Sequence, residues 1–393
     1  MVTLTSAQDA LKSVYLGVVS NALNINANPL LGKIKQTTKD VWGKEIRMLA
    51  PYGINGGIGA GSEEGPLPAP AANNYVQFVS TLKNLYGTIE ISDKAIRASA
   101  NDAGAFVNLL NDEMEGLIKA SGFNLSRMLY GDGSGALCKA VSYAAGTKTL
   151  TVDSVKNLIE GMVVDIYNGN AFVEGGLRIL TIDRTSKNIT FFNGPAGTPA
   201  ANHVLYVQKS KDQEITGLGN IFAGTGTLYG VNKADNPWLN PYVAVNAGEI
   251  NDAKIQTAID YLEELSGGSV DFITCSAAVK RAYQQYLSYY KRNTEVMELA
   301  GGYKAISYNG IPIVADRFVA DDTMYLLDTN EFALHQLCDW KWLEDDKGNV
   351  IKQNGGLPTY SATLVKYADL ICSKPNAQAK ITGILSTVTD PFV

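Results

Sequence analysis

Hydrophobic residues near the N-terminus recur at the spacing of a helix. Ser6 and Asp9 suit an N-cap and its capping-box partner. The apolar residues that follow fall on one helical face before Pro29, and they are Leu11, Tyr15, Val18, Val19 and Ala22. This pattern predicts one amphipathic helix within an N-terminal arm.

Two strand-like stretches flank a segment that is poor in bulky side chains. Residues 41–49 and 75–91 have β character, whereas residues 51–74 read PYGINGGIGAGSEEGPLPAPAANN. Gly, Pro and Ala at this density form turns and cannot fill a core. The pattern predicts an extended hairpin arm whose long tip needs a neighbouring subunit to order it. We expect subunit contacts from the flanking strands at Trp42, Ile46, Val76, Phe78 and Leu82.

A longer helical pattern begins at Asn101. Its apolar residues recur every three or four positions, and they are Phe106, Leu109, Leu110, Met114, Leu117, Ile118, Leu125, Met128 and Leu129. At the standard rise per residue, a helix of this length spans about 40 Å and can serve as a spine. The glycine-rich sequence YGDGSG, residues 130–135, predicts where the helix ends.

Residues 136–213 are almost entirely strand-like. Short segments such as TKTLTVDS, GMVVDIYN and HVLYVQ are separated by Gly, Asn, Asp and Pro. This spacing predicts a small all-β unit, a barrel or a sandwich, inserted into the chain.

The rest of the sequence mixes helices with strands. We expect helices over 249–265 and 276–290 and strands at 270–274, 306–314 and 323–327, which together predict an α/β sandwich. Near the C-terminus, LHQLCDWKW and TYSATLVKYADLIC alternate in the manner of long strands. They fit a sheet laid beside the spine helix.

Composition and charge exclude several classes of protein. The 393 residues are 46% hydrophobic and 18% charged, which suits several folded domains and not a disordered or fibrous chain. The net charge of -6 argues against a surface that grips nucleic acid, because such surfaces cluster Lys and Arg. The sequence shows no signal peptide and no apolar run long enough to cross a bilayer, so we expect synthesis in the cytoplasm and no membrane partner.

Few residues suit catalysis or metal binding. His203 and His335 are the two histidines of the chain, and they lie in different predicted units. The cysteines contain no CxxC pair, so we expect reduced and mostly buried thiols at Cys138, Cys275, Cys338 and Cys372.

The glycine-rich segments and the acidic pairs are explained by turns, helix ends and solvated surfaces. Residues 131–135 lack the Lys of a phosphate-binding loop and follow a helix, while residues 224–230 have the wrong spacing for a dinucleotide loop. The acidic pairs 63–64, 263–264 and 345–346 are typical of solvated turns and helix faces. We therefore expect no catalytic residue, no metal site and no cofactor.

One tyrosine-rich helix allows two interpretations. Tyr283, Tyr286, Tyr289 and Tyr290 occur within eight residues, with basic residues at both ends of the run. They can form a core face, or they can form an aromatic subunit contact, because Tyr and Arg are enriched at interfaces. The second interpretation adds Tyr286 and Tyr290 to the expected subunit contacts.

The order of these parts resembles the Hong Kong 97-like major capsid fold of tailed bacteriophages. The matching segments are ISDKAIRAS before the spine, NLSRMLYGDGSG at its end, TGLGNIF, YNGIPIVADRF and VKYADLICSKPNAQAKITGI. The resemblance implies an α+β fold with an N-arm, an extended β-hairpin loop, a spine helix, an α/β axial domain and an inserted small all-β domain. The expected divisions are 1–40 for the N-terminal arm, 41–92 for the hairpin loop, 93–135 for the peripheral domain with the spine helix, 136–213 for the insert, 214–240 for the return to the peripheral domain, 241–335 for the axial domain and 336–393 for the closing strands.

The resemblance also implies partners and a location. Relatives form hexamers and pentamers in an icosahedral shell around double-stranded DNA, inside a virion assembled in a bacterial host. Because the chain lacks a long charged N-terminal helical segment, we expect a separate scaffolding protein. A portal is also expected as a partner, and the sequence leaves the presence of decoration proteins open. Some relatives join subunits by Lys–Asn isopeptide bonds; Lys83 lies in the hairpin arm, but no partner is evident and no crosslink is predicted.

Two other functions compete with this one. An encapsulin, a cellular nanocompartment that holds a protein cargo, has the same fold; the β insert and the long arm favour the phage interpretation. A soluble nucleotide-dependent enzyme is disfavoured by the glycine segments discussed above.

Overall fold

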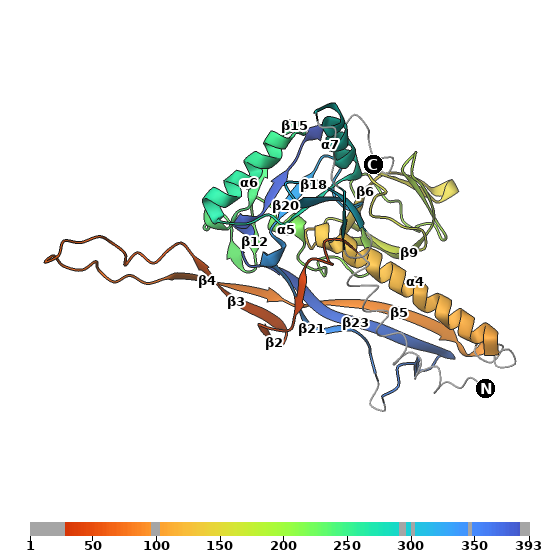
Figure 1. Cartoon of the computed structure of the whole chain (residues 1–393). Helices are drawn as coiled ribbons and strands as arrows, with labels where there is room; N and C mark the ends of the chain where they lie inside the picture. Colours follow the sequence, from red (N-terminus) through yellow and green to blue (C-terminus); the bar gives the residue numbers. More distant parts are fainter. Residues whose placement is uncertain (1–27, 96–102, 291–295, 300–302, 345–347, 386–393) are drawn as a thin grey trace.

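The computed structural model describes residues 28–95, 103–290, 296–299, 303–344 and 348–385. The predicted N-terminal helix lies outside these ranges. The described chain forms a body with a hairpin arm at one end and a spine helix directed toward the other (Figure 1). Two further units, an α/β domain and a β-barrel, lie on the same side of a long sheet as the spine helix.

The spine helix α4 packs on a five-stranded sheet. The helix covers Ala103–Tyr130, close to its predicted limits. The sheet has the order β1-β21-β23-β22, and β5 pairs with β23 on its other flank. Leu85, Ile89 and Ile91 of β5 are buried, and a Cβ on Gly87 would approach Leu117 of the helix to 2.9 Å, so the glycine allows the helix to pack closely. The strands are β1 Lys35–Thr37, β5 Lys83–Ser92, β21 Phe332–Trp342, β22 Lys352–Gln353 and β23 Thr359–Cys372.

The arm is a hairpin with a short extra strand at its base. β2 (Val41–Trp42) turns through Gly43, whose φ of +64° favours glycine, into β3 (Glu45–Tyr52). The single strand predicted over 41–49 is therefore wrong, because this left-handed turn divides it. β3 pairs with β4 (Asn74–Thr81), and the tip between them contains no strand.

The inserted unit is a closed β-barrel of order β10-β7-β6-β11-β8-β9. It has its own hydrophobic core, which includes Leu150, Val164, Ile189 and Leu205. Its strands are β6 Ala136–Ala144, β7 Thr149–Val152, β8 Val163–Asn168, β9 Ala171–Asp183, β10 Asn188–Phe191 and β11 Val204–Val207.

The axial domain is a seven-stranded sheet of order β14-β24-β20-β16-β19-β18-β17 with two helices. Asn251 caps α6 by accepting a hydrogen bond from the backbone of Lys254, and Gly267 ends the helix in a left-handed conformation. The elements are α6 Asp252–Ser266, α7 Ala277–Tyr290, β14 Tyr242–Ala244, β16 Phe272–Cys275, β17 Val296–Leu299, β18 Tyr303–Tyr308, β19 Ile311–Ala315, β20 Met324–Leu327 and β24 Ala379–Ile381.

Short elements connect these parts. They are α5 Leu218–Ile221, β12 Thr227–Leu228, β13 Val231–Asn232, β15 Gly248–Glu249, β25 Ile384–Leu385 and the 3-10 turns Ala145–Thr147, Pro237–Leu239, Thr329–Glu331 and Pro375–Ala377. In the part of the chain that the structure describes, no helix has both the length and the apolar character needed to span a bilayer.

Candidate functional site

The base of the arm is anchored to the body through one face of its hairpin. The Tyr52 ring stacks on Trp238 with centroids 4.5 Å apart, and Phe78 packs against Tyr229 at 5.5 Å. The backbone N–H of Val79 donates a hydrogen bond to the carbonyl of Tyr229 at 2.9 Å. These contacts fix the direction in which the arm leaves the body.

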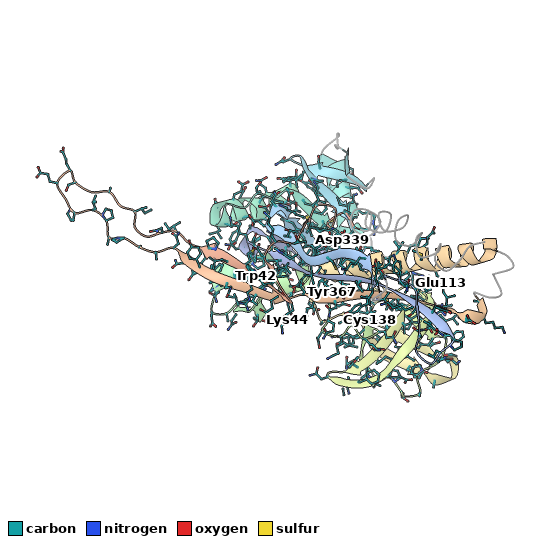
Figure 2. The ribbon with its side chains drawn as sticks, turned by 90° about the horizontal axis from the view of Figure 1, so that it is seen from below. Trp42, Lys44, Glu113, Cys138, Asp339 and Tyr367 are labelled. Atoms are coloured by element: carbon teal, nitrogen blue, oxygen red, sulfur yellow. The ribbon has the colours of Figure 1, made fainter. Side chains whose placement is uncertain are left out.

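The opposite face of the hairpin and the tip expose large apolar side chains. Trp42 is 71% exposed and Leu49 60% exposed, and with Arg47, Met48 and Gln77 they line a shallow hollow at the arm base. Figure 2, which views the molecule from below, shows Trp42 at this base beside Lys44. Apolar surface of this kind is typical of a protein–protein interface.

Most of the tip is exposed, including all of its large apolar side chains. Ile54, Ile58 and Leu67 are 75%, 74% and 90% exposed, although each would gain free energy by burial. The acidic pair Glu63 and Glu64 is also exposed there. The chain itself offers these side chains almost no cover, as the arm projects away from the body (Figure 1).

The structure corrects part of the expected set of subunit contacts. Ile46 and Phe78 are each 1% exposed and belong to the core of their own chain, because they lie on the anchored face of the hairpin. They are therefore not free to contact a second subunit in this conformation.

The other expected contacts differ in their exposure. Trp42 is exposed, as a contact requires, whereas Val76 and Leu82 are half-buried against the body. Tyr286 is half-buried against the axial core, and the side chain of Tyr290 lies outside the described residues. Five exposed apolar residues were not among the expected contacts, and they are Leu49, Tyr75, Ile54, Ile58 and Leu67. The alternation of side chains along β3 and β4 indicates the first two.

The tyrosine-rich helix contributes to the axial core. Tyr283 is 1% exposed, and its hydroxyl donates a hydrogen bond to Asp252 Oδ1 at 2.7 Å. Tyr286 stacks beside it with ring centroids 6.1 Å apart. For these two residues the core interpretation holds, while Tyr286 keeps part of its surface exposed.

A buried ion pair joins the end of the spine helix to the chain that returns from the barrel. Arg127 and Glu214 are 4% and 2% exposed and form a bidentate pair, with Nη1 and Oε2 3.0 Å apart. Beside it, the N–H of Gly219 donates to the carbonyl of Gly131 at 2.9 Å. A Cβ on Gly217 would collide with the carbonyl oxygens of Met128 and Gly131, so the returning chain needs glycine there.

The same contacts account for the two glycine-rich segments. Residues 131–135 end a helix and pack against residues 214–219, where no long helix begins. Residues 224–230 lead into the small β12–β13 hairpin and include its first strand and its turn. Neither segment presents the N-terminus of a long helix to an anion, which a phosphate-binding loop requires.

The barrel is held against the axial domain by Lys156. This residue is 8% exposed, and its Nζ donates to the carbonyl of Val319 at 2.7 Å and to Asp321 Oδ1 at 2.6 Å. The Arg317 guanidinium, which donates to the carbonyl of Lys156 at 3.4 Å, lies 4.9 Å from the ring centroid of Phe123 on the spine helix. Barrel, axial loop and spine helix therefore meet at one junction.

Buried charged groups in the body have partners that fix the sheet. Lys366, fully buried on β23, donates to Asp339 Oδ1 at 2.8 Å and to Gln36 Oε1 at 3.1 Å, and burial lowers its pKa. Asp369 accepts hydrogen bonds from Ser80 and from the backbone N–H of Thr216, and burial raises its pKa. These groups join the arm, the return segment and the sheet.

Candidate catalytic residues are dispersed over the structure. His335 is buried with Nδ1 2.8 Å from the carbonyl of Lys39, whereas His203 lies in the barrel and contacts its own loop. Among the described residues, no group of three His, Cys, Asp or Glu side chains could hold a metal ion. Glu263 and Glu264 lie on the exposed face of α6, and the acidic pair 345–346 falls outside the described ranges.

The cysteines are free thiols in the structure. Cys138, Cys275 and Cys372 are buried and Cys338 is half-buried. Burial raises the pKa of Cys275 to about 12 and raises those of Cys138 and Cys372 further. These three thiols are protonated near neutral pH, which agrees with the expectation of reduced, mostly buried cysteines.

Comparison with known proteins shows which solved structures share this fold. No family model matches the sequence, and no curated protein matches it. Among solved structures, the chain is similar to the capsid subunit of cyanophage A-1(L), with 12% identity and a TM-score of 0.53 over 93% of this chain and 92% of that one. It is also similar to the encapsulin SrpI from Synechococcus elongatus PCC 7942, with 8% identity and a TM-score of 0.51 over 92% of this chain and 89% of that one. Similarity at such low identity shows a shared fold.

Proposed function

We propose that this chain, which has the Hong Kong 97-like capsid fold, is the major capsid protein of a tailed bacteriophage. Copies of it assemble as hexamers and pentamers into an icosahedral head that encloses double-stranded DNA. Its role is structural and not enzymatic. The head is built in the cytoplasm of a bacterial host and becomes part of the virion.

The observation that carries this proposal is the arm. Its base is fixed to the body by the Tyr52–Trp238 stack, yet its tip exposes Ile54, Ile58 and Leu67. A monomeric protein gains nothing from holding apolar side chains away from its core. In a shell, the body of an adjacent copy covers the tip, and burial of these side chains then favours assembly.

The charge of the chain agrees with a container for DNA. A net charge of -6 repels phosphates on average, so the shell can enclose DNA without holding it tightly or in a sequence-specific manner. We assign no cofactor and no metal to this role. We expect a separate scaffolding protein and a portal as partners.

An encapsulin-type shell is the second candidate, because the SrpI subunit shares the fold over most of both chains. The inserted barrel favours the phage head, since a projecting unit with its own core adds an outer surface that a simple container does not need. The two candidates differ in what the particle holds, which is DNA in one case and a protein cargo in the other.

Expression of the chain with its neighbouring genes tests the proposal. We expect light scattering to report particles of megadalton size and nuclease-protected DNA to accompany particles from infected cells. A monodisperse monomer under all these conditions would refute the shell function. Particles that contain a dedicated cargo enzyme and no DNA would replace the phage head by the encapsulin.

A further inference from the structure

The arm tip carries an asparagine–glycine pair, Asn55–Gly56, in a segment without helix or strand. Both residues are exposed. The Asn55 side chain is not randomly oriented, because its Oδ1 accepts a hydrogen bond from the backbone N–H of Gly57 at 2.9 Å. This bond turns the side-chain carbonyl toward the backbone that follows and withdraws electrons from Cγ, which favours attack at that carbon.

We propose that Asn55–Gly56 is a site of spontaneous deamidation in the unassembled subunit. The backbone nitrogen of Gly56 attacks Asn55 Cγ and loses its proton, and the bond from Cγ to the side-chain nitrogen breaks. Ammonia leaves with that proton, and a cyclic imide remains. Water then opens the imide at either carbonyl and yields aspartate or isoaspartate.

Glycine at position 56 is what makes the attack possible. It has no side chain to shield its nitrogen, and its backbone is free to turn toward the Asn55 side chain. The neighbouring tip residues provide little restraint, since Ile54 is 75% exposed and Ile58 74% exposed. The segment can therefore sample the near-attack geometry that an intramolecular reaction needs.

Two other asparagine–glycine pairs of the chain, Asn309–Gly310 and Asn354–Gly355, are held more firmly. The Asn354 amide donates to Glu90 Oε1 at 3.2 Å and to Thr359 Oγ1 at 2.9 Å, and its oxygen accepts from Ser361 at 2.7 Å. Asn309 and its glycine occupy a tight turn with φ values of 49° and 81° between the paired strands β18 and β19. Such hydrogen bonds and strand pairing restrain the side chain or the backbone that must rotate before the glycine nitrogen can attack Cγ, so Asn354 and Asn309 serve as internal controls.

The reaction would change the surface on which assembly depends. Aspartate or isoaspartate adds a third negative charge to a tip that already carries Glu63 and Glu64. Isoaspartate also inserts an extra methylene into the backbone, which alters the path of the arm. This consequence rests on the proposed function: if assembly orders the tip against a neighbour, deamidation is slowed in particles and continues in subunits that fail to assemble.

Incubation of the purified full chain in heavy-oxygen water, followed by peptide mass analysis, tests the inference. We expect the Asn55 peptide of unassembled subunits to take up label on the order of a hundredfold faster than the Asn354 peptide, because loss of near-attack geometry costs about that factor. The variant Asn55→Gln should abolish uptake in the tip, and Gly56→Ala should slow it strongly. Equal rates for Asn55 and Asn354 in the unassembled chain would overturn the site itself.

The dependence on assembly has its own readout. Particles and unassembled subunits are incubated in parallel, and we expect Asn55 to be protected in particles only. Equal uptake in both states would overturn the assembly-linked part and leave the shell function standing. Fast, selective uptake in a chain that forms no particles under any condition would support the site while refuting the proposed function.

Discussion

Shortening the apolar side chains of the arm tip should weaken assembly much more than it destabilises the unassembled chain. In the triple variant Ile54→Ala, Ile58→Ala and Leu67→Ala, each change removes about three carbon groups, worth about 2.4 kcal/mol per side chain at full burial. Because Ile54, Ile58 and Leu67 are 75%, 74% and 90% exposed, the unassembled chain buries only a small part of each of them. Its unfolding free energy should therefore fall by only about 1–2 kcal/mol in total.

The effect on assembly is expected to be much larger. If a neighbouring subunit covers the exposed parts of the three side chains, the variant loses about 4–6 kcal/mol of contact free energy per subunit. That loss raises the concentration needed for assembly by about a thousandfold to ten-thousandfold. Light scattering over a dilution series measures this threshold, and thermal melts of unassembled subunits measure the stability.

A matched change at the arm base provides the control. Ile46→Ala removes the same groups from a side chain that is 1% exposed, so we expect the unassembled chain itself to lose about 2–5 kcal/mol. The reasoning is refuted if the tip variant melts as early as Ile46→Ala, because the tip would then be packed on its own chain. It is equally refuted if the tip variant assembles at the parental concentration.

Four further outcomes follow from the same contacts. The two ends of the barrel segment lie close together, because the N–H of Asp212 donates a hydrogen bond to the carbonyl of Ser134. Replacing residues 136–213 by a short Gly/Ser linker should therefore leave a cooperative thermal transition in the rest of the chain. Loss of that transition would show that the barrel is part of the main core. Lys156→Met should cost about 1.5–3 kcal/mol and speed hydrogen exchange at the junction between barrel and axial domain, whereas unchanged exchange would show that the contact is unimportant. Glu214→Gln should cost about 3–5 kcal/mol in thermal melts because it leaves the Arg127 guanidinium buried without its carboxylate, and a loss below about 1 kcal/mol would contradict this. The folded-state pKa of Asp369 is raised above 3.8, so its contribution to stability is present below pH 3.8 and is lost as the pH rises through the folded-state pKa. The unfolding free energy of Asp369→Asn, measured relative to that of the parent, should therefore rise over this pH window. A difference that stays constant with pH would refute the shift.

The long elements could be predicted from periodicity alone. The apolar residues of the spine gave a helix within two residues of Ala103–Tyr130, and the alternation in TYSATLVKYADLIC matches β23, Thr359–Cys372. In both elements the local pattern and the packed structure agree, because apolar residues such as Met114, Leu125 and Leu129 on the helix and Leu364 and Leu370 on the strand are buried. The barrel was likewise foreseeable as short strands separated by turn residues.

Contacts between distant segments were not predictable. Ile46 and Phe78 were expected at a subunit surface, but they are buried because residues 229 and 238, far along the chain, cover that face of the hairpin. A hairpin pattern shows that two faces differ and not which of them meets the body. The junction at Lys156 has the same origin, since its partners Val319 and Asp321 are more than 150 residues away.

Electron microscopy of the assembled protein tests the central claim most directly. We predict closed icosahedral shells in which each arm lies across an adjacent subunit and the residue 136–213 barrel projects from the surface. The density should place Ile54, Ile58 and Leu67 against apolar side chains of that neighbour. Purified protein that remains monomeric after co-expression with its neighbouring genes, or shells whose arm tips extend into solvent, would contradict the account.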